Sequence, residues 1–128
     1  MQMRAYQAVL PEMNKHNATL VAISPELPDN SLSFQEKNEL GFEVLSDVGN
    51  NVARDFGLVF TLDDDAVEVF KNSFNLILPE KNGVDSWELP IPATYVIDQD
   101  RAIALAFVEP DYTKRVEPDK LLETLAAL

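Results

Sequence analysis

Residues 18–24 read A-T-L-V-A-I-S, and this short, nearly continuous apolar run stops at Pro25. A strand that is buried on both faces, as in a parallel sheet, has this character. A second apolar stretch of this kind lies at Thr94–Asp98. We therefore expect Leu20–Ser24 and Thr94–Asp98 to be buried strands of one sheet.

Further strands and helices are predicted on both sides of this run. The strands Thr94–Asp98 and Ala102–Val108 flank Gln99–Arg101, a spacing that predicts a hairpin. The segment Met1–Lys15 has apolar residues at helical spacing, and Pro11 predicts a kink or a restart within it. The other expected elements are a helix from Ser31 or Ser33 to about Leu40, strands at Phe42–Leu45 and Leu58–Leu62, helices at Asn51–Phe56 and Asp63–Asn72, and a C-terminal helix from Pro118.

The remaining segment, Phe74–Pro92, carries turn signals such as Asn82-Gly83 and reads mostly as loop. Strands and helices otherwise alternate along the chain. This order predicts an α/β fold with a mixed sheet.

Composition and charge exclude some classes of binding partner for this chain. The chain has 128 residues, of which 46% are hydrophobic, and this suits one compact domain. Its formal net charge of −12 repels phosphate backbones and anionic lipid surfaces, so we expect neither nucleic acid nor membrane as a partner. No apolar stretch reaches the roughly 18 residues of a membrane-spanning helix, and no signal peptide is recognised, so we expect a cytoplasmic protein.

The chain contains no cysteine, which excludes disulfides, thiolate metal sites and a cysteine nucleophile. Asp63, Asp64 and Asp65 could suggest a divalent metal, but they do not match a calcium-loop spacing and fit the start of a helix. His16, the single histidine, fits a helix C-terminus better than a catalytic role. We expect no metal and no cofactor.

Six segments spread over nearly the whole chain share a pattern with one known family. They are L-V-A-I-S-P-E (Leu20–Glu26), F-E-V-L-S-D (Phe42–Asp47), N-V-A-R-D-F-G-L (Asn51–Leu58), N-G-V-D-S-W-E-L-P (Asn82–Pro90), P-A-T-Y-V-I-D (Pro92–Asp98) and D-Y-T-K-R-V-E-P (Asp111–Pro118). In this order they resemble the peroxiredoxin-like branch of the alkyl hydroperoxide reductase and thiol-specific antioxidant family. The resemblance implies a thioredoxin-like fold with a mixed central sheet flanked by helices, and thiol-dependent reduction of hydroperoxides.

The chain also departs from that family. The family has a first core strand and a loop with the reactive cysteine, which sits at the start of the helix resembling Met1–Lys15. We therefore expect residues 1–128 to form a single, N-terminally incomplete thioredoxin-like domain whose first core strand is missing. Either the gene is truncated, or its start codon was assigned downstream of the true one.

The resemblance also marks residues of the active-site face. Pro92, followed by Thr94 at the start of a strand, matches the proline beside the active site, often preceded by a cis bond; the other interpretation is a plain strand-initiating proline. Arg115 and Arg4 could polarise a peroxide, ahead of Arg54 and Arg101, although surface arginines paired with acids would look the same. Trp87 could line a substrate pocket. The other interpretation is that its ring packs in the core and anchors a loop.

We therefore expect a peroxiredoxin-like protein without a catalytic residue, inactive because its nucleophilic cysteine is absent. A hydroperoxide and a thiol reductant become partners only if the true gene product carries an upstream cysteine. The alternative is a non-catalytic interaction module on the same fold. We also expect a homodimer with rearranged or exchanged elements, because strands that lose a central neighbour expose unpaired main-chain groups. The alternative is a monomer in which the two strands beside the missing one pair directly.

Overall fold

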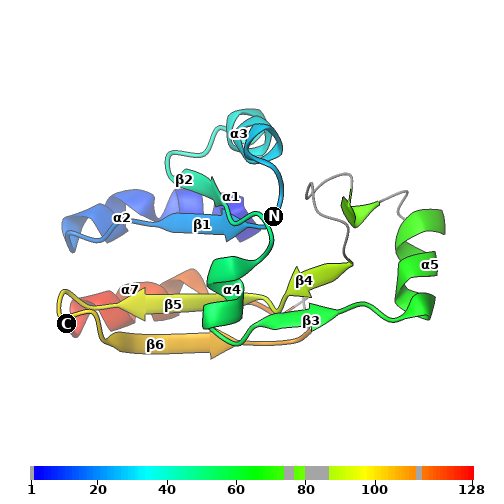
Figure 1. Ribbon diagram of the computed structural model, residues 1–128. Helices are drawn as coiled ribbons and strands as arrows, with labels where there is room; N and C mark the ends of the chain where they lie inside the picture. Colours follow the sequence, from blue (N-terminus) through cyan, green and yellow to red (C-terminus); the bar gives the residue numbers. More distant parts are fainter. Residues whose placement is uncertain (1, 74–76, 80–86, 112–113) are drawn as a thin grey trace. The chain divides into compact units, whose positions relative to one another are not determined.

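The computed structural model describes residues 2–73, 77–79, 87–111 and 114–128 (Figure 1). Its contacts divide the chain into two compact units. The first consists of Met1–Val21, Asn38–Glu43 and Ile91–Leu128, and the second of Ala22–Lys37 and Val44–Pro90.

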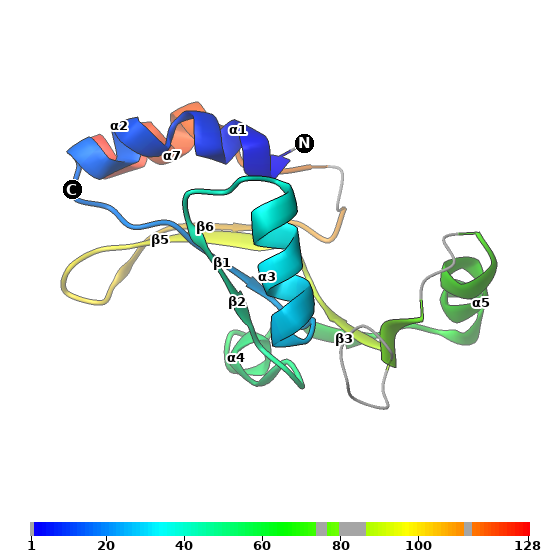
Figure 2. The ribbon, with the colours of Figure 1, turned by 90° about the horizontal axis from the view of Figure 1, so that it is seen from above.

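The first unit is a hairpin covered by helices on one side. Strands β5 (Ala93–Ile97) and β6 (Ile103–Val108) pair antiparallel, and helices α1 (Gln2–Ala8), α2 (Leu10–Lys15) and α7 (Pro118–Ala126) lie along one face of the pair (Figure 2). The buried core of this unit consists of Tyr6, Met13, Val96, Val116 and Leu121. Leu105 and Phe107 pack against this core, as expected for alternate residues of one strand that share a face.

The predicted interruption of the first helix is confirmed. Helix α1 ends at Ala8 and α2 starts at Leu10, with Pro11 in its first turn. Proline is tolerated there because the first N–H groups of a helix have no intrahelical acceptor. The hydroxyl of Tyr6 donates a hydrogen bond of 2.9 Å to the carbonyl oxygen of Val116, which joins α1 to the segment before α7.

The second unit contains two short strand pairs. Strands β1 (Val21–Ser24) and β2 (Glu43–Ser46) form one pair, and β3 (Val59–Thr61) and β4 (Glu88–Pro90) form an antiparallel one. Helix α3 (Pro28–Lys37) packs on the first pair, where Ser31 Oγ lies 2.6 Å from Ser46 Oγ. Helices α4 (Asn51–Asp55) and α5 (Asp64–Asn72) complete the unit, and the carboxylate of Asp63 caps α5 by accepting the N–H of Ala66, as predicted.

The expectation that Leu20–Ser24 and Thr94–Asp98 are buried strands of one sheet is wrong. Val21 and Ile23 of β1 are 43% and 54% exposed, and β1 pairs with β2 whereas β5 pairs with β6. An apolar run shows that its side chains favour burial, but the burial itself depends on segments far away in the sequence. In this unit α3 covers one face of the β1–β2 pair, so exposure alternates along both strands.

Two further boundaries differ from the sequence-based expectations. Helix α3 starts at Pro28 and not at Ser31 or Ser33, because a proline in the first turn needs no N–H acceptor; Ser31 is buried inside the helix. The segment Phe74–Pro92 contains a strand, β4, in its described part. The Asn82-Gly83 turn signal lies outside the described residues.

Candidate functional site

Pro92 and Thr94 lie at the start of β5. Pro92 is half-buried, and its carbonyl oxygen accepts the N–H of Glu109 at 3.2 Å. Thr94 lies opposite Phe107 and shares the face of the hairpin on which Val96 enters the core. No peptide bond among the described residues is cis, so the cis bond expected before Pro92 is wrong. The trans isomer is the intrinsic preference of such bonds, and the resemblance alone does not fix it.

The two arginines of the predicted site belong to the same unit as Pro92. Arg4 is exposed on α1, on a different face from the buried Tyr6. Arg115 is half-buried, and its Nη1 donates to the carbonyl oxygen of Lys114 at 3.3 Å. The hydrogen bond from Tyr6 to Val116 therefore brings the two chain segments together, whereas the guanidinium of Arg4 lies in solvent.

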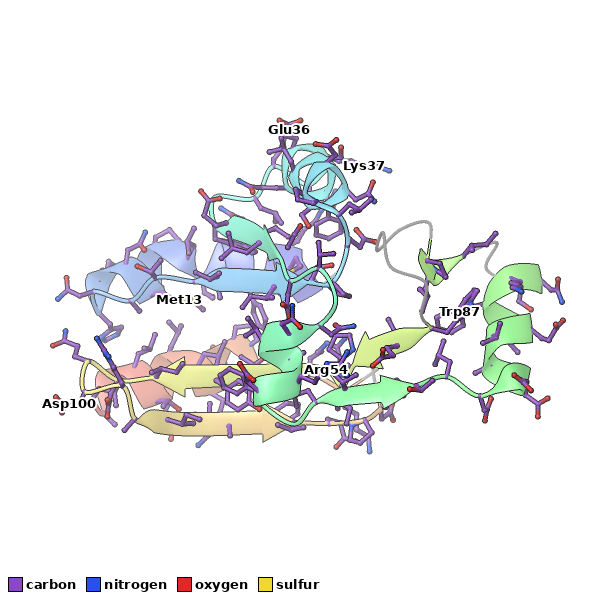
Figure 3. The ribbon with its side chains drawn as sticks, in the orientation of Figure 1. Met13, Glu36, Lys37, Arg54, Trp87 and Asp100 are labelled. Carbon is purple, nitrogen blue, oxygen red and sulfur yellow. The ribbon has the colours of Figure 1, made fainter. Side chains whose placement is uncertain are left out.

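Trp87 belongs to the second unit. Its side chain is labelled in Figure 3. Its carbonyl oxygen accepts the N–H of Leu62 at 2.9 Å, and the Nζ of Lys71 lies 5.5 Å from the centre of its ring. The next residue, Glu88, forms an ion pair of 2.9 Å with Arg54. These contacts tie the β3–β4 pair to α4 and α5. The role of Trp87 in a substrate pocket stays a prediction.

Apart from Pro92, the side chains predicted for the active-site face, together with His16, are hydrogen-bond donors and include no thiolate. Thr94 supplies a hydroxyl, and Arg4 and Arg115 supply guanidinium groups that suit an anion or a polarised oxygen. His16 is exposed at the C-terminal cap of α2. None of these side chains replaces a thiolate as an attacking group, and their role toward a ligand stays a prediction.

Sequence reasoning missed a buried polar residue with several hydrogen bonds, Asp47. The buried carboxylate of Asp47 accepts hydrogen bonds of 3.0–3.1 Å from the N–H groups of Val52 and Ala53, and its own N–H donates to the Ser24 carbonyl oxygen at 2.7 Å. The sequence signal for this role is an aspartate shortly before the start of a helix. Its neighbour Asn50 is 2% exposed with φ 60°, and its Oδ1 has no hydrogen-bond partner among the described residues.

The described residues contain neither a metal-binding cluster nor a membrane-spanning helix. No group of three or more histidine, aspartate or glutamate side chains is arranged to hold a metal ion. In the same part of the chain, no helix has the length and apolar character needed to cross a membrane.

Comparison with known proteins adds the family. The profile of the AhpC/TSA family matches residues 1–106, and comparison with curated proteins returned no significant match. Among solved structures, the chain is similar to the crystal structure of peroxidoxin BcpB from Mycobacterium tuberculosis, with a TM-score of 0.69 and 22% identity over 98% of this chain and 69% of that one. This likeness confirms the predicted α/β, thioredoxin-like fold. Because the family profile spans well over half of the sequence, the chain belongs to the AhpC/TSA family.

Proposed function

We propose that these 128 residues form a peroxiredoxin-like domain that does not itself reduce hydroperoxides. The observation that carries this proposal is the absence of cysteine from the sequence. In thiol-dependent peroxide reduction, a thiolate attacks the O–O bond and becomes a sulfenic acid, which a second thiol then reduces. The three methionines can be oxidised to sulfoxides, but a thiol reductant alone does not return them to the thioether.

A peroxide-consumption assay tests this proposal. Purified protein is mixed with hydrogen peroxide or an organic hydroperoxide and a dithiol reductant, and peroxide loss is compared with that of the reductant alone. We expect no turnover beyond the amount that three methionines consume. A cysteine-containing peroxiredoxin serves as the positive control, and an intact mass unchanged by iodoacetamide shows that the sample holds no thiol. Sustained turnover by such a sample would contradict the proposal.

Thiol chemistry would return if the natural gene product carried a cysteine before Met1. Reading the genomic DNA upstream of the Met1 codon, in frame, tests this. An in-frame segment that encodes a strand and a cysteine-bearing loop would make a hydroperoxide and a thiol reductant the partners of the longer protein. The proposal would then hold for these 128 residues alone.

A second candidate function, a non-catalytic interaction module, is favoured by the apolar side chains that the strands expose. Ile23 and Leu45 are about half exposed on the β1–β2 pair. On the hairpin, about half of each side chain is exposed at Ile97, Ile103 and Val108. Burial of such side chains against another chain would be favourable. This candidate predicts self-association or a specific partner. A single species near 14.3 kDa in sedimentation at micromolar concentration would remove the homodimer.

A further inference from the structure

A small, open hollow lies in the first unit, beside helix α2. Its volume is about 170 Å³. Helix α2 lines it with Leu10 and Asn14, the chain just before β1 with Thr19 and Leu20, and the start of β2 with residues 41–43. All of these residues belong to the first unit, so the shape of the hollow depends on one compact body alone.

The buried side of the hollow is apolar. Phe42 is 5% exposed, and Leu10 and Leu20 are half-buried and pack against the core of the unit. An apolar cavity of about 150 Å³ in a protein core can take up benzene. The hollow therefore has room for one aromatic ring or for an apolar group of similar size.

Gly41 provides space where the loop before β2 meets the helices. Its φ is not in the left-handed region, unlike the values of 84° and 72° at Gly49 and Gly57, so the backbone does not require glycine here. A Cβ atom at this position would lie 3.1 Å from Gln7 Nε2 and 3.2 Å from Leu10 Cδ2. The N–H of Gly41 donates to Gln7 Oε1, which holds the loop against α1. Glycine therefore permits this close approach at the lining of the hollow.

Three exposed polar side chains form the rim of the hollow, namely Asn14, Thr19 and Glu43. Within the described residues, none of these side chains makes a hydrogen bond or an ion pair. Each carries an oxygen that accepts hydrogen bonds, and Glu43 adds a negative charge. In the described part of the chain, the lining includes no lysine or arginine. The rim is therefore rich in acceptors, and its charge is negative.

We propose that this hollow binds a small primary amine in its ammonium form, joined by a short link to an aromatic ring or an apolar group of similar size. An ammonium group has three N–H donors and no acceptor, which matches the acceptor oxygens of Asn14, Thr19 and Glu43. The carboxylate balances the charge of the ligand. The apolar group packs on Phe42 and the two leucines.

The charge of the chain favours this class of ligand over its analogues. A net charge of −12 attracts cations and repels carboxylates and phosphates, whereas a neutral alcohol of the same shape lacks the attraction to Glu43. Because the hollow is open and such a ligand has about eight non-hydrogen atoms, we expect a dissociation constant on the order of 1 mM. This inference is independent of the proposed lack of peroxidase activity, since neither a thiol nor a peroxide takes part in the binding.

Titration with benzylamine, followed by the NMR chemical shifts of the backbone amides, tests the site. At pH 7 and constant ionic strength, we expect saturable shifts confined to residues 19–20, 41–43 and their neighbours. Benzyl alcohol keeps the ring without the charge, and ethylamine keeps the charge without the ring, so each should bind about fivefold more weakly or worse. Shifts that do not saturate, that map elsewhere, or that are equal for benzylamine and either analogue would overturn the proposal.

Glu43→Gln separates the charge of the rim from the general charge of the chain. It keeps the size of the side chain and removes the carboxylate, so the dissociation constant for benzylamine should rise about fivefold or more. Glu123→Gln is the matched control, because Glu123 is exposed on α7, does not line the hollow, and changes the net charge by the same amount. We expect this control to change the constant by less than about twofold, since salt screens a distant charge.

Both variants alter exposed side chains, and cooperative thermal unfolding of each would show that the fold is retained. An equal rise of the dissociation constant in both variants would mean that benzylamine is attracted only to the acidic chain as a whole. An unchanged constant in Glu43→Gln would mean that the rim does not hold the ammonium group. Either result would overturn the proposed site.

Discussion

At the scale of single residues, Asp47 shows how a buried carboxylate organises a loop. Its two oxygens accept the N–H groups of Val52 and Ala53 in the first turn of α4. Asp47→Ala would leave these donors without their acceptor inside the unit. We expect this change to lower the free energy of unfolding by about 1–3 kcal/mol, because each unpaired buried polar group has a cost of that order.

Urea denaturation measures this effect, and Asp55→Ala provides the matched control. Asp55 is an exposed acid of the same helix, and its carboxylate makes no hydrogen bond within the described residues. Loss of an exposed acid away from such contacts should change stability by less than about 0.5 kcal/mol. Equal effects of the two substitutions would contradict the role assigned to Asp47.

Tyr6 offers a second test at this scale. Its side chain is 3% exposed, and its hydroxyl donates to the Val116 carbonyl oxygen at 2.9 Å. Tyr6→Phe keeps the ring in the core but leaves that carbonyl unpaired. We expect a loss of about 1–3 kcal/mol in the free energy of unfolding. If thermal and urea unfolding were unchanged, the hydrogen bond would have no part in joining α1 to the segment before α7.

At the scale of elements, the turn between β5 and β6 holds a residue in a strained backbone conformation. Arg101 has φ 67°, in the left-handed region that costs a non-glycine residue about 1–2 kcal/mol. Arg101→Gly relieves this cost, although glycine adds about 0.5–1 kcal/mol of chain entropy. We expect a net gain in stability of about 0.5–1 kcal/mol.

Arg101→Ala is the control for this prediction. It removes the same charge but keeps a Cβ atom, so the backbone strain should persist. The difference in the urea midpoint between the two variants isolates the backbone effect. A glycine variant no more stable than the alanine variant would show that the turn is not strained at this position.

The elements that were predicted correctly have their sequence signals within or next to their own residues. Asp63 precedes a helix and caps it, Pro118 opens α7, and the hairpin turn lies between two apolar strands. The elements that were missed depend on distant partners. Strand β4 has three residues, and its pairing with Val59–Thr61 of β3 defines it. A strand this short has no period that could be read from the sequence alone.

The candidate site was less predictable than the fold for the same reason. Pro92 and Thr94 could be assigned to the start of a strand, because proline and the following apolar residues act locally. The isomer of the bond before Pro92, and the directions of Arg4 and Arg115, depend on tertiary packing that spacing does not encode. The capping role of Asp47 could have been predicted, since an acid before a helix start is a recognised signal.

At the scale of the whole molecule, the dominant property is charge. The chain carries 22 acidic and 10 basic residues, and its formal net charge is −12. In the described residues, ion pairs link Lys15 to Glu12 and Arg54 to Glu88. Like charges held together in a folded chain repel one another, and this repulsion destabilises the compact state. These two pairs are partly or largely exposed to solvent, so each contributes little that salt could weaken.

We therefore expect sodium chloride to stabilise this protein. Between about 0.01 and 0.5 M salt the screening length falls from about 30 Å to a few Å, so repulsion across a unit is removed while short contacts persist. The thermal unfolding midpoint should rise over this range. Glu123→Lys, on the exposed face of α7, changes the net charge from −12 to about −10 and should reduce the rise by about a third, because self-repulsion scales with the square of the charge. A midpoint that falls with salt would mean that the described ion pairs outweigh the excess of acids.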